Sequence, residues 1–455
     1  MKNLTSMDYM DGLTNYIINF PNYSHYYTSY VNNITHIKIS GNFSYIEEKA
    51  FSYFESLEIV EFGETTNILF IPKFAFLGCK KLKKITISSS CISIEEGSFK
   101  DCIKIKVIQF KMNKSIKNYS CLRYIKKEAF YNCSSLKSIV FPPSLIALCE
   151  SAFMNCTSLE KVMIGIIIDN KFRLPQPDEE KLKIIEKYVF KNCINLLSFR
   201  LPQSCVYMGP SSFMNCKKME TFEYKGKELN SIPARCFLNC SSLKQIEFHH
   251  FVYKNNNDQM IIDNKYRVIR NIKKEQDYYP FSIGAESFMN CISLISVIIE
   301  DESKSIETII MNNSKIKFIY PIHLVMNDFG PKKKIIHKKA FLNCRSLKNA
   351  RFFLGNLECI CENTFENCFS LLSIELNSQY VKLLFKDNYN STSFLEIPNE
   401  LQIKLYNENK LIELIKKPTE TTNHLYHRRH FKEHLTSLDN TFFNQFDADN
   451  NNNNI

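Results

Sequence analysis

Apolar residues alternate with polar ones over short runs along most of the chain. Leu136, Ile139 and Phe141 have the spacing of a short β-strand that turns alternate side chains toward a core. Two prolines follow directly and end the strand, because proline cannot donate to a β-ladder. A second apolar stretch at 145–148 leads into residues 150–153, which we expect to form a helical turn or a short helix on the opposite side.

This pattern belongs to a repeat, A-F-x-N-C-x-S-L-x-x-I-x-F, of which residues 129–141 are a clear copy. Ten of eleven copies have Cys three residues after the repeated Phe, and the first has Phe54 there. The copies are marked by Phe51, Phe76 and Cys79, Phe99 and Cys102, Phe130 and Cys133, Phe153 and Cys156, Phe190 and Cys193, Phe213 and Cys216, Phe237 and Cys240, Phe288 and Cys291, Phe341 and Cys344, and Phe365 and Cys368.

The commonest distance between repeated Phe residues is 23 or 24 positions, which lies within the period range of leucine-rich repeats. Longer distances, such as the 53 positions from Phe288 to Phe341, predict long loops or a degenerate repeat. Residues 167–173 closely match residues 261–267, which indicates that two of the insertions are ordered. One unit cannot bury its own apolar residues, so the units must stack into one continuous core.

The cysteines of the repeat are predicted to be structural. Stacked copies would lie about 4.8 Å apart with parallel Cβ vectors, which disfavours disulfide bridging. A buried Cys behaves as a small hydrophobic residue. No C-x-x-C pair occurs, and Cys359 with Cys361 gives only a weak C-x-C, so a metal or redox array is not indicated.

The repeat resembles the repeat of a known protein family. Phe-Pro-Pro-Ser-Leu at 141–145, followed by Ala-Phe-Met-Asn-Cys-Thr-Ser-Leu at 152–159, resembles the BspA-type leucine-rich repeat. The resemblance covers roughly residues 34–385. It implies an α/β repeat solenoid, curved, with a parallel β-sheet on one face and short helical or irregular segments on the other. It further implies binding or adhesion, with no catalytic residues and no cofactor.

The exposed positions of the predicted strands are the candidate partner-binding surface, because solenoids bind through extended faces. These positions are Ser138, Val140, Lys161, Met163, Ser198, Arg200, Thr221, Glu223, Gln245, Glu247, Ser296, Ile298, Asn349, Arg351, Ser373 and Glu375. The row is basic at Arg200, acidic at Glu223 and Glu247, and basic again at Arg351. A mixed row suits a protein partner better than a nucleic acid, which needs a continuous basic stripe.

The two ends depart from the repeat. Residues 1–33 are expected to cap the first unit, and residues 386–440 to form a small helical region. Within it, one predicted helix runs from Glu400 to Lys416 and a second from His424 to Leu438. Residues 441–455 are a low-complexity, Asn-rich tail that we expect to be disordered.

The second predicted helix leaves a metal site open as an alternative. His427, His430 and His434 would share one face, and His430 with His434 has the spacing of a ligand pair. No Glu occupies the H-E-x-x-H position, so metalloprotease chemistry is not supported. The predicted metal set is therefore none, with a His-rich metal-binding helix kept as an alternative.

Composition narrows the function further. The chain has 455 residues, a formal net charge of +11, 17 Cys and only 11 Gly, and so few Gly argue against a glycine-rich phosphate-binding enzyme. No apolar run is long enough to cross a membrane, and the first residues lack a secretory signal, so a cytosolic location with reduced thiols is expected. The leading interpretation is a non-catalytic binding scaffold. A surface adhesin exported without a signal, or peripheral attachment to a membrane or cell surface, stays open.

Overall fold

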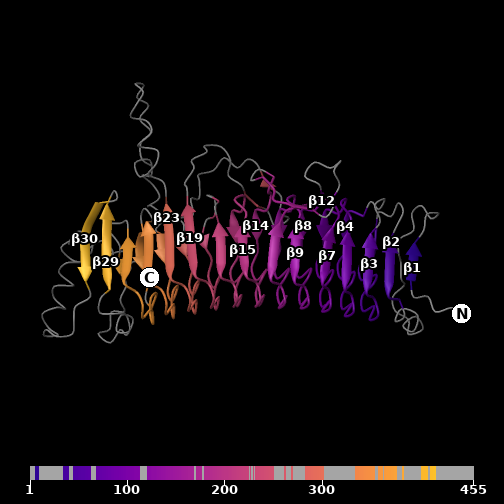
Figure 1. The fold of residues 1–455 in the computed structure, drawn as a ribbon. Helices are drawn as coiled ribbons and strands as arrows, with labels where there is room; N and C mark the ends of the chain where they lie inside the picture. The colour runs from indigo at the N-terminus through magenta and orange to yellow at the C-terminus, as the bar shows by residue number, and fades with distance from the viewer. Residues whose placement is uncertain are drawn as a thin grey trace, which may run out of the picture.

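The computed structural model describes residues 6–9, 34–39, 45–62, 68–112, 120–168, 171–176, 179–224, 226, 229, 231–250, 261–262, 268–269, 282–301, 334–353, 357–361, 363–376, 382–383, 401–407 and 410–416. They form a long solenoid in which the strands stand side by side along its length (Figure 1).

The longer strands build the main sheet. They are β1 (Ser6–Tyr9), β2 (His36–Ile39), β3 (Ile59–Phe62), β5 (Lys84–Ile87), β7 (Val107–Phe110), β9 (Ser138–Phe141), β11 (Lys161–Ile164), β15 (Ser198–Leu201), β17 (Thr221–Tyr224), β19 (Gln245–His250), β23 (Ser296–Asp301), β25 (Asn349–Phe353), β27 (Ser373–Leu376), β29 (Gln402–Asn407) and β30 (Lys410–Lys416). Hydrogen bonds join them in two groups, β1 to β7 and β9 to β30. All neighbours pair in parallel except β29 with β30. The predicted parallel-sheet solenoid is confirmed.

The opposite side of the core carries a second row of short strands. They are β4 (Phe70–Ile71), β6 (Ser93–Ile94), β8 (Tyr124–Ile125), β10 (Ala147–Leu148), β14 (Ile184–Ile185), β16 (Tyr207–Met208), β18 (Ser231–Ile232), β22 (Ser282–Ile283), β24 (Lys334–Ile336), β26 (Leu357–Ile360) and β28 (Lys382–Leu383). They also pair in parallel from one unit to the next. The apolar stretch 145–148 therefore feeds a strand on the opposite side.

The segment after each short strand is a tight turn, and no helix occurs among the residues listed above, so of the helical turn or short helix expected before Phe153 only a turn forms. Two residues per turn have positive φ, as at Ser151 (57°) and Asn155 (64°). The second of them is Asn in eight units, because Asn tolerates the left-handed conformation better than most residues. These left-handed residues reverse the chain where a helix would have continued it.

The core consists of ladders that run along the solenoid. The rings of the repeated Phe residues stack with centroids 5.1 to 5.7 Å apart, as between Phe76 and Phe99 or Phe213 and Phe237. The repeated Cys residues are fully buried beside them. At the first unit, Phe54 occupies the Cys position and meets Phe51 edge-on at 5.6 Å.

The C-terminal helix predicted for Glu400 to Lys416 was wrong, because this segment forms the antiparallel pair β29–β30. Leu401 and Ile403 are buried with the period of a strand. Strand β29 pairs in parallel with β27, from Ser373↔Gln402 to Leu376↔Leu405. The backbone N–H and C=O groups along the edge of β27 form hydrogen bonds with residues 402–405. This strand pairing outweighs the helical preference that the spacing of the leucines suggests. The second predicted helix, from His424 to Leu438, lies outside the described residues.

At the N-terminal end, β1 pairs in parallel with β2, so residues 6–9 extend the main sheet by one strand beyond the first unit. The rest of the predicted 1–33 cap lies outside the described residues. In the part of the chain that the structure describes, there is no helix long and apolar enough to cross a membrane.

Candidate binding surface

The outward positions of the main strands form two rows, the first paired from strand to strand throughout and the second in three paired stretches. Lys161 lies opposite Ser138 and Ser198, and Ser198 lies opposite Thr221. The pairing continues through Gln245, Ser296 and Asn349 to Ser373. The second row joins Met163 with Val140, Arg200 with Glu223, Glu247 with Ile298, and Arg351 with both Ile298 and Glu375. The structure thus brings the candidate residues together on one face.

Most of these side chains are accessible. The exposed ones are Ser138, Lys161, Ser198, Arg200, Thr221, Glu223, Gln245, Glu247, Asn349 and Arg351, and the half-buried ones are Val140, Met163, Ser296, Ile298 and Glu375. Ser373 is buried, and its hydroxyl donates to Asn349 Oδ1 at 2.9 Å. Ser373 therefore supports its neighbour and offers little surface to a ligand.

Ion pairs tie parts of this face together. Arg351 Nε donates to Glu375 Oε2 at 2.8 Å, and Lys404 Nζ approaches Glu375 Oε1 at 3.4 Å. Arg200 forms a two-pronged pair with Glu180, whose side chain is almost fully buried. Glu180 comes from the insertion after β11, so this pair anchors the insertion onto the sheet.

The insertion contains a β-hairpin, β12 (Ile166–Ile168) and β13 (Lys171–Arg173), paired antiparallel. It leaves the main sheet at the carboxyl end of β11 and separates that strand from β15, since the two share only the register pair Lys161↔Ser198. Arg173 holds the returning chain by a two-pronged pair with Glu179, at 3.0 and 3.1 Å. The hairpin thus has a fixed base on the sheet.

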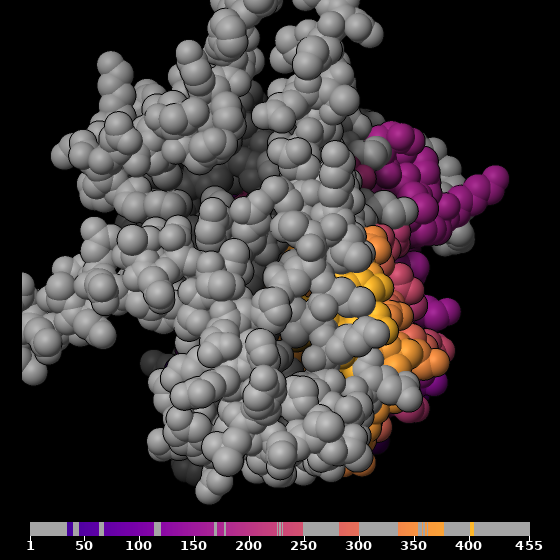
Figure 2. Space-filling model, turned by 90° about the vertical axis from the view of Figure 1, so that its left-hand side faces the viewer, coloured from indigo at the N-terminus to yellow at the C-terminus, as the bar shows by residue number. Residues whose placement is uncertain are grey.

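The hairpin presents apolar side chains to solvent. Ile167, Phe172 and Leu174 are 36%, 44% and 60% exposed. In Figure 2, the magenta-purple lobe of this segment stands out beyond the edge of the coloured sheet. Exposed apolar clusters beside polar residues are typical of interaction sites.

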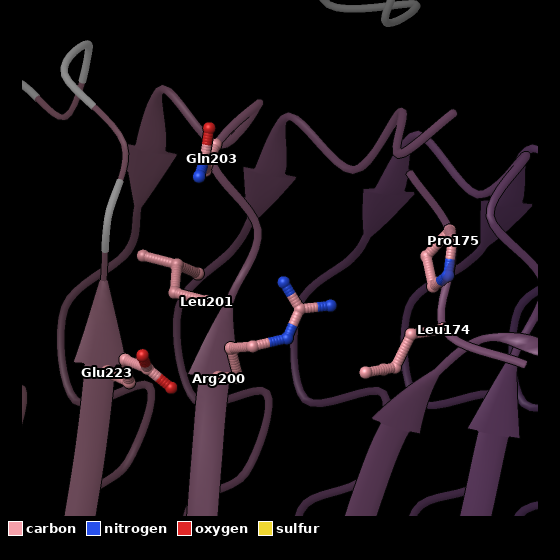
Figure 3. Close-up of a pocket in the computed structure, with 6 residues that line it drawn as sticks. All are labelled: Leu174, Pro175, Arg200, Leu201, Gln203 and Glu223. Carbon is pink, nitrogen blue, oxygen red and sulfur yellow. The ribbon is translucent and has the colours of Figure 1, made fainter. Parts of the chain in front are cut away.

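A hollow of about 180 Å³ lies between the insertion and the sheet, lined by Leu174, Pro175, Arg200, Leu201, Gln203 and Glu223. Figure 3 shows the Arg200 side chain extending toward the Leu174 and Pro175 side, with the Glu223 carboxylate on the neighbouring strand. One wall is apolar and the floor carries one cation and one carboxylate. A hollow of this kind fits an apolar side chain flanked by polar groups, as protein partners present.

Residue-by-residue reasoning identified Arg200 and Glu223 but missed Leu174, Phe172 and Glu180. The sequence similarity between residues 167–173 and residues 261–267 was the feature that could have identified this insertion as structured. Both segments form antiparallel pairs, the second as β20 (Ile261–Ile262) with β21 (Val268–Ile269). The shared motif therefore marks an antiparallel strand pair in each of the two insertions, although the two pairs have different registers.

The buried thiols are hydrogen-bond donors. Each repeated Cys donates its Sγ–H to the carbonyl of the Phe one unit earlier, as from Cys156 to Phe130 at 3.3 Å and from Cys240 to Phe213 at 3.2 Å. Burial raises the pKa of the Cys156 thiol to about 12. A protonated, buried thiol is a poor nucleophile and a poor metal ligand.

No group of three or more His, Cys, Asp or Glu side chains arranged to hold a metal occurs within the ranges that the structure describes. The histidines of the alternative metal site, His427, His430 and His434, lie outside those ranges.

Comparison with known families gives one clear match. The model of the BspA type leucine-rich repeat region (6 copies) matches residues 21–123, 113–173, 170–261, 269–390 and 326–409, which is most of the chain. A search of curated proteins found no match.

Solved structures with a similar fold include three bacterial proteins. A leucine-rich repeat protein from Bacteroides ovatus is 22% identical, with 82% of this chain and 84% of that chain covered and a TM-score of 0.38. The leucine-rich repeat protein of T. pallidum is 24% identical over 41% of this chain and 77% of that chain, with a TM-score of 0.32. The pneumococcal vaccine antigen PcpA is 15% identical over 82% of this chain and 78% of that chain, with a TM-score of 0.37.

Proposed function

Because the chain belongs to the BspA-type leucine-rich repeat family, we propose that it is a non-catalytic scaffold that binds a protein partner through the outward face of its main sheet. The observation that carries this proposal is the hollow between β15, β17 and the insertion, where the outward row meets exposed apolar side chains. Interfaces combine such apolar anchors with a polar rim.

The electrostatics of the face favour a protein over a polyanion. Arg200 is paired with Glu180, and Arg351 is paired with Glu375, so the basic residues of the outward row are largely neutralised within the chain. Glu223 and Glu247 add exposed negative charge beside them. A partner with small apolar and mixed polar side chains matches this surface.

Site-specific photo-crosslinking tests the proposal. A photoreactive amino acid is placed at Leu174 or at Glu223 in the full chain, and at Tyr207 as a control. Tyr207 is 45% exposed but lies on the short-strand side of the core. We expect one discrete protein adduct at the first two positions and none at Tyr207. Adducts of equal pattern at all three positions, or none at Leu174 and Glu223, would refute the sheet face as the site.

We propose a reducing compartment, the cytosol, as its location. The ladder thiols act as hydrogen-bond donors and therefore need to stay reduced, and the cytosol keeps thiols in that state. The alternative, display at the cell surface, is distinguished by protease treatment of intact and permeabilised cells. Loss of the protein in intact cells would overturn the cytosolic proposal and support an adhesin.

A further inference from the structure

The edge of the solenoid at the amino ends of the main strands is a second continuous surface. It consists of the positions four, five and seven residues after each repeated Phe, here named the basic edge. Backbone hydrogen bonds place neighbouring units side by side along it, as from Lys106 N to Lys83 O at 2.8 Å and from Lys348 N to Ile295 O at 2.9 Å. In Figure 1 it is the row of turns below the main strands.

The basic edge holds much of the positive charge of the chain. Eleven Lys or Arg side chains lie on it, all exposed, against four Glu. The basic residues are Lys80, Lys81, Lys83, Lys104, Lys106, Lys137, Lys217, Lys218, Lys244, Arg345 and Lys348, and the acidic ones are Glu55, Glu58, Glu160 and Glu220. Two of the pairs neutralise each other, Lys83 with Glu58 at 2.8 Å and Lys244 with Glu220 at 2.6 Å. The excess on this one edge is seven, compared with +11 for the whole chain.

The C-terminal half of the same edge carries exposed apolar side chains. They are Ile194, Leu197, Ile292, Ile295, Phe369 and Leu372, each 38% to 50% exposed. Three units supply them in pairs, and basic side chains stand in the units between. Arg345 and Lys348, for example, lie one unit from Ile292 and Ile295 on one side and one unit from Phe369 and Leu372 on the other.

The basic edge is also uninterrupted. In each of the eleven units the main strand begins eight residues after the repeated Phe, from Phe51 and Ile59 to Phe365 and Ser373. At a strand spacing of about 4.8 Å, the eleven units span about 48 Å. Within these turns, all of which the structure describes, no unit is longer than its neighbours, so a flat partner can touch many units at once.

We propose that the basic edge docks the protein on an anionic phospholipid bilayer, with Arg345 and Lys348 at the headgroups and Ile292, Ile295, Phe369 and Leu372 entering the interfacial layer. Basic side chains gain attraction from an anionic leaflet, and apolar side chains beside them gain from leaving water. Nucleic acid fits the charge but offers no apolar layer for exposed aliphatic residues. The outward sheet face stays free for a protein partner in this orientation.

Vesicle co-sedimentation of the full chain tests the proposal. Vesicles of phosphatidylcholine alone are compared with vesicles that also contain phosphatidylserine, for the unaltered chain and for Arg345→Glu with Lys348→Glu. The matched control is Lys127→Glu with Lys338→Glu, which makes the same charge change at exposed positions three residues before a repeated Phe, at the start of the turns and outside the three positions per unit that define the basic edge. A third variant, Phe369→Ser with Leu372→Ser, keeps all charges.

We expect binding only to the phosphatidylserine vesicles. Each basic residue near an anionic leaflet contributes about fivefold, so the Arg345 and Lys348 variant should bind at least about thirtyfold more weakly, while the control changes little. The Phe369 and Leu372 variant should also lose affinity. Equal binding to both vesicle types, or equal losses in the control, would overturn the proposal. So would binding of single-stranded RNA that competes with vesicles and is insensitive to the Phe369 and Leu372 variant, since that marks a polyanion site.

Discussion

The two edges of the solenoid differ in how freely the chain length varies. From each repeated Phe to the main strand the distance is eight residues in every unit. From the start of the main strand to the next repeated Phe it ranges from 15 residues, between Ser138 and Phe153, to 45, between Ser296 and Phe341. All the extra residues therefore lie between the end of a main strand and the next short strand, because every short strand from β4 to β26 ends five residues before the next repeated Phe.

This difference has a physical origin in the ladders. The constant segment contains the stacked Phe, the Asn that donates to its counterpart one unit earlier, the thiol that donates to the Phe carbonyl one unit earlier, and the buried Leu. One inserted residue there would break four ladders at once. Among the residues that the structure describes, the carboxyl edge shows no comparable ladder, so insertions such as β12–β13 are tolerated and can carry a binding site.

The largest expected effect on stability comes from a substitution in the constant segment between the repeated Phe and the main strand. Phe213→Ala removes a ring that stacks 5.4 Å from Phe190 and 5.7 Å from Phe237. We expect the free energy of unfolding to fall by about 4 kcal/mol, as for other buried Phe truncations. In the insertion, Leu174→Ala should change the free energy of unfolding by less than about 0.5 kcal/mol, because the Leu174 side chain is 60% exposed. Urea unfolding measures both, and similar losses would contradict the distinction between the edges.

The asparagine ladder is expected to be the next most sensitive feature. Asn239 has a φ of 62°, donates to Asn215 Oδ1 at 2.7 Å and accepts from Asn290 at 2.7 Å. Asn239→Ala should lower the free energy of unfolding by about 3 kcal/mol, through lost hydrogen bonds and left-handed strain. Asn239→Gly should cost about 1 kcal/mol less, since glycine tolerates positive φ. Equal urea midpoints for the two variants would show that conformation contributes nothing.

A smaller effect tests how the insertion is fastened to the sheet. Arg200→Ala leaves the buried Glu180 carboxylate without its partner, and we expect a loss of about 2 kcal/mol in unfolding free energy. Adding Glu180→Gln should recover part of that loss. The matched control is Arg351→Ala, whose partner Glu375 keeps Lys404, so its cost should stay below about 1 kcal/mol. Additive losses in the Arg200 and Glu180 pair would argue against coupling.

A further expected effect, absent at neutral pH, appears in the pH dependence of stability above pH 9. The pKa of Cys156 is about 12 in the folded chain, against an ordinary value of 9.0, because burial disfavours the thiolate. The raised pKa means that its contribution is full below pH 9 and is lost as the pH rises from 9 toward 12. The loss is about 1.4 kcal/mol per pH unit for this thiol.

Cys156→Ala should therefore reduce the pH slope of the unfolding free energy by that amount between pH 9 and pH 11. Thr157→Ala, at the neighbouring position, removes no titrating group and should leave the slope unchanged. If both variants kept the slope of the unaltered chain, the thiol ladder would not be a source of alkaline sensitivity.

Much of this fold could be predicted because equivalent residues of successive repeats contact one another, so the repeat pattern itself indicates which residues pack together. The spacing of Leu136, Ile139 and Phe141 predicts a strand, and eleven copies in register predict a stack. The same reasoning failed for Glu400 to Lys416, where leucines at helical spacing also fit a strand with Leu401 and Ile403 inward. A local pattern of this length fits both periods, and the free edge of β27 decided between them.

The site was predicted only in part. The outward row follows from alternation along a strand, so Arg200 and Glu223 could be named from the sequence. Leu174 and Glu180 could not, because they reach the sheet from an insertion whose path depends on where the chain returns. Composition gave the charge of +11, but its concentration on one edge depends on the constant turn length that places Lys106, Lys348 and their counterparts side by side.

By itself, the sequence determined the repeating unit, the buried face of each strand and the ladder of Phe and Cys. Each of these follows from a local pattern that recurs at equivalent positions in units that stack on one another. Only the tertiary structure decided that the turns contain left-handed residues and are not helical, that β29 and β30 join the sheet, and that Glu180 of the insertion pairs with Arg200. These features depend on contacts between residues far apart in the chain, whose free energy a local pattern does not contain.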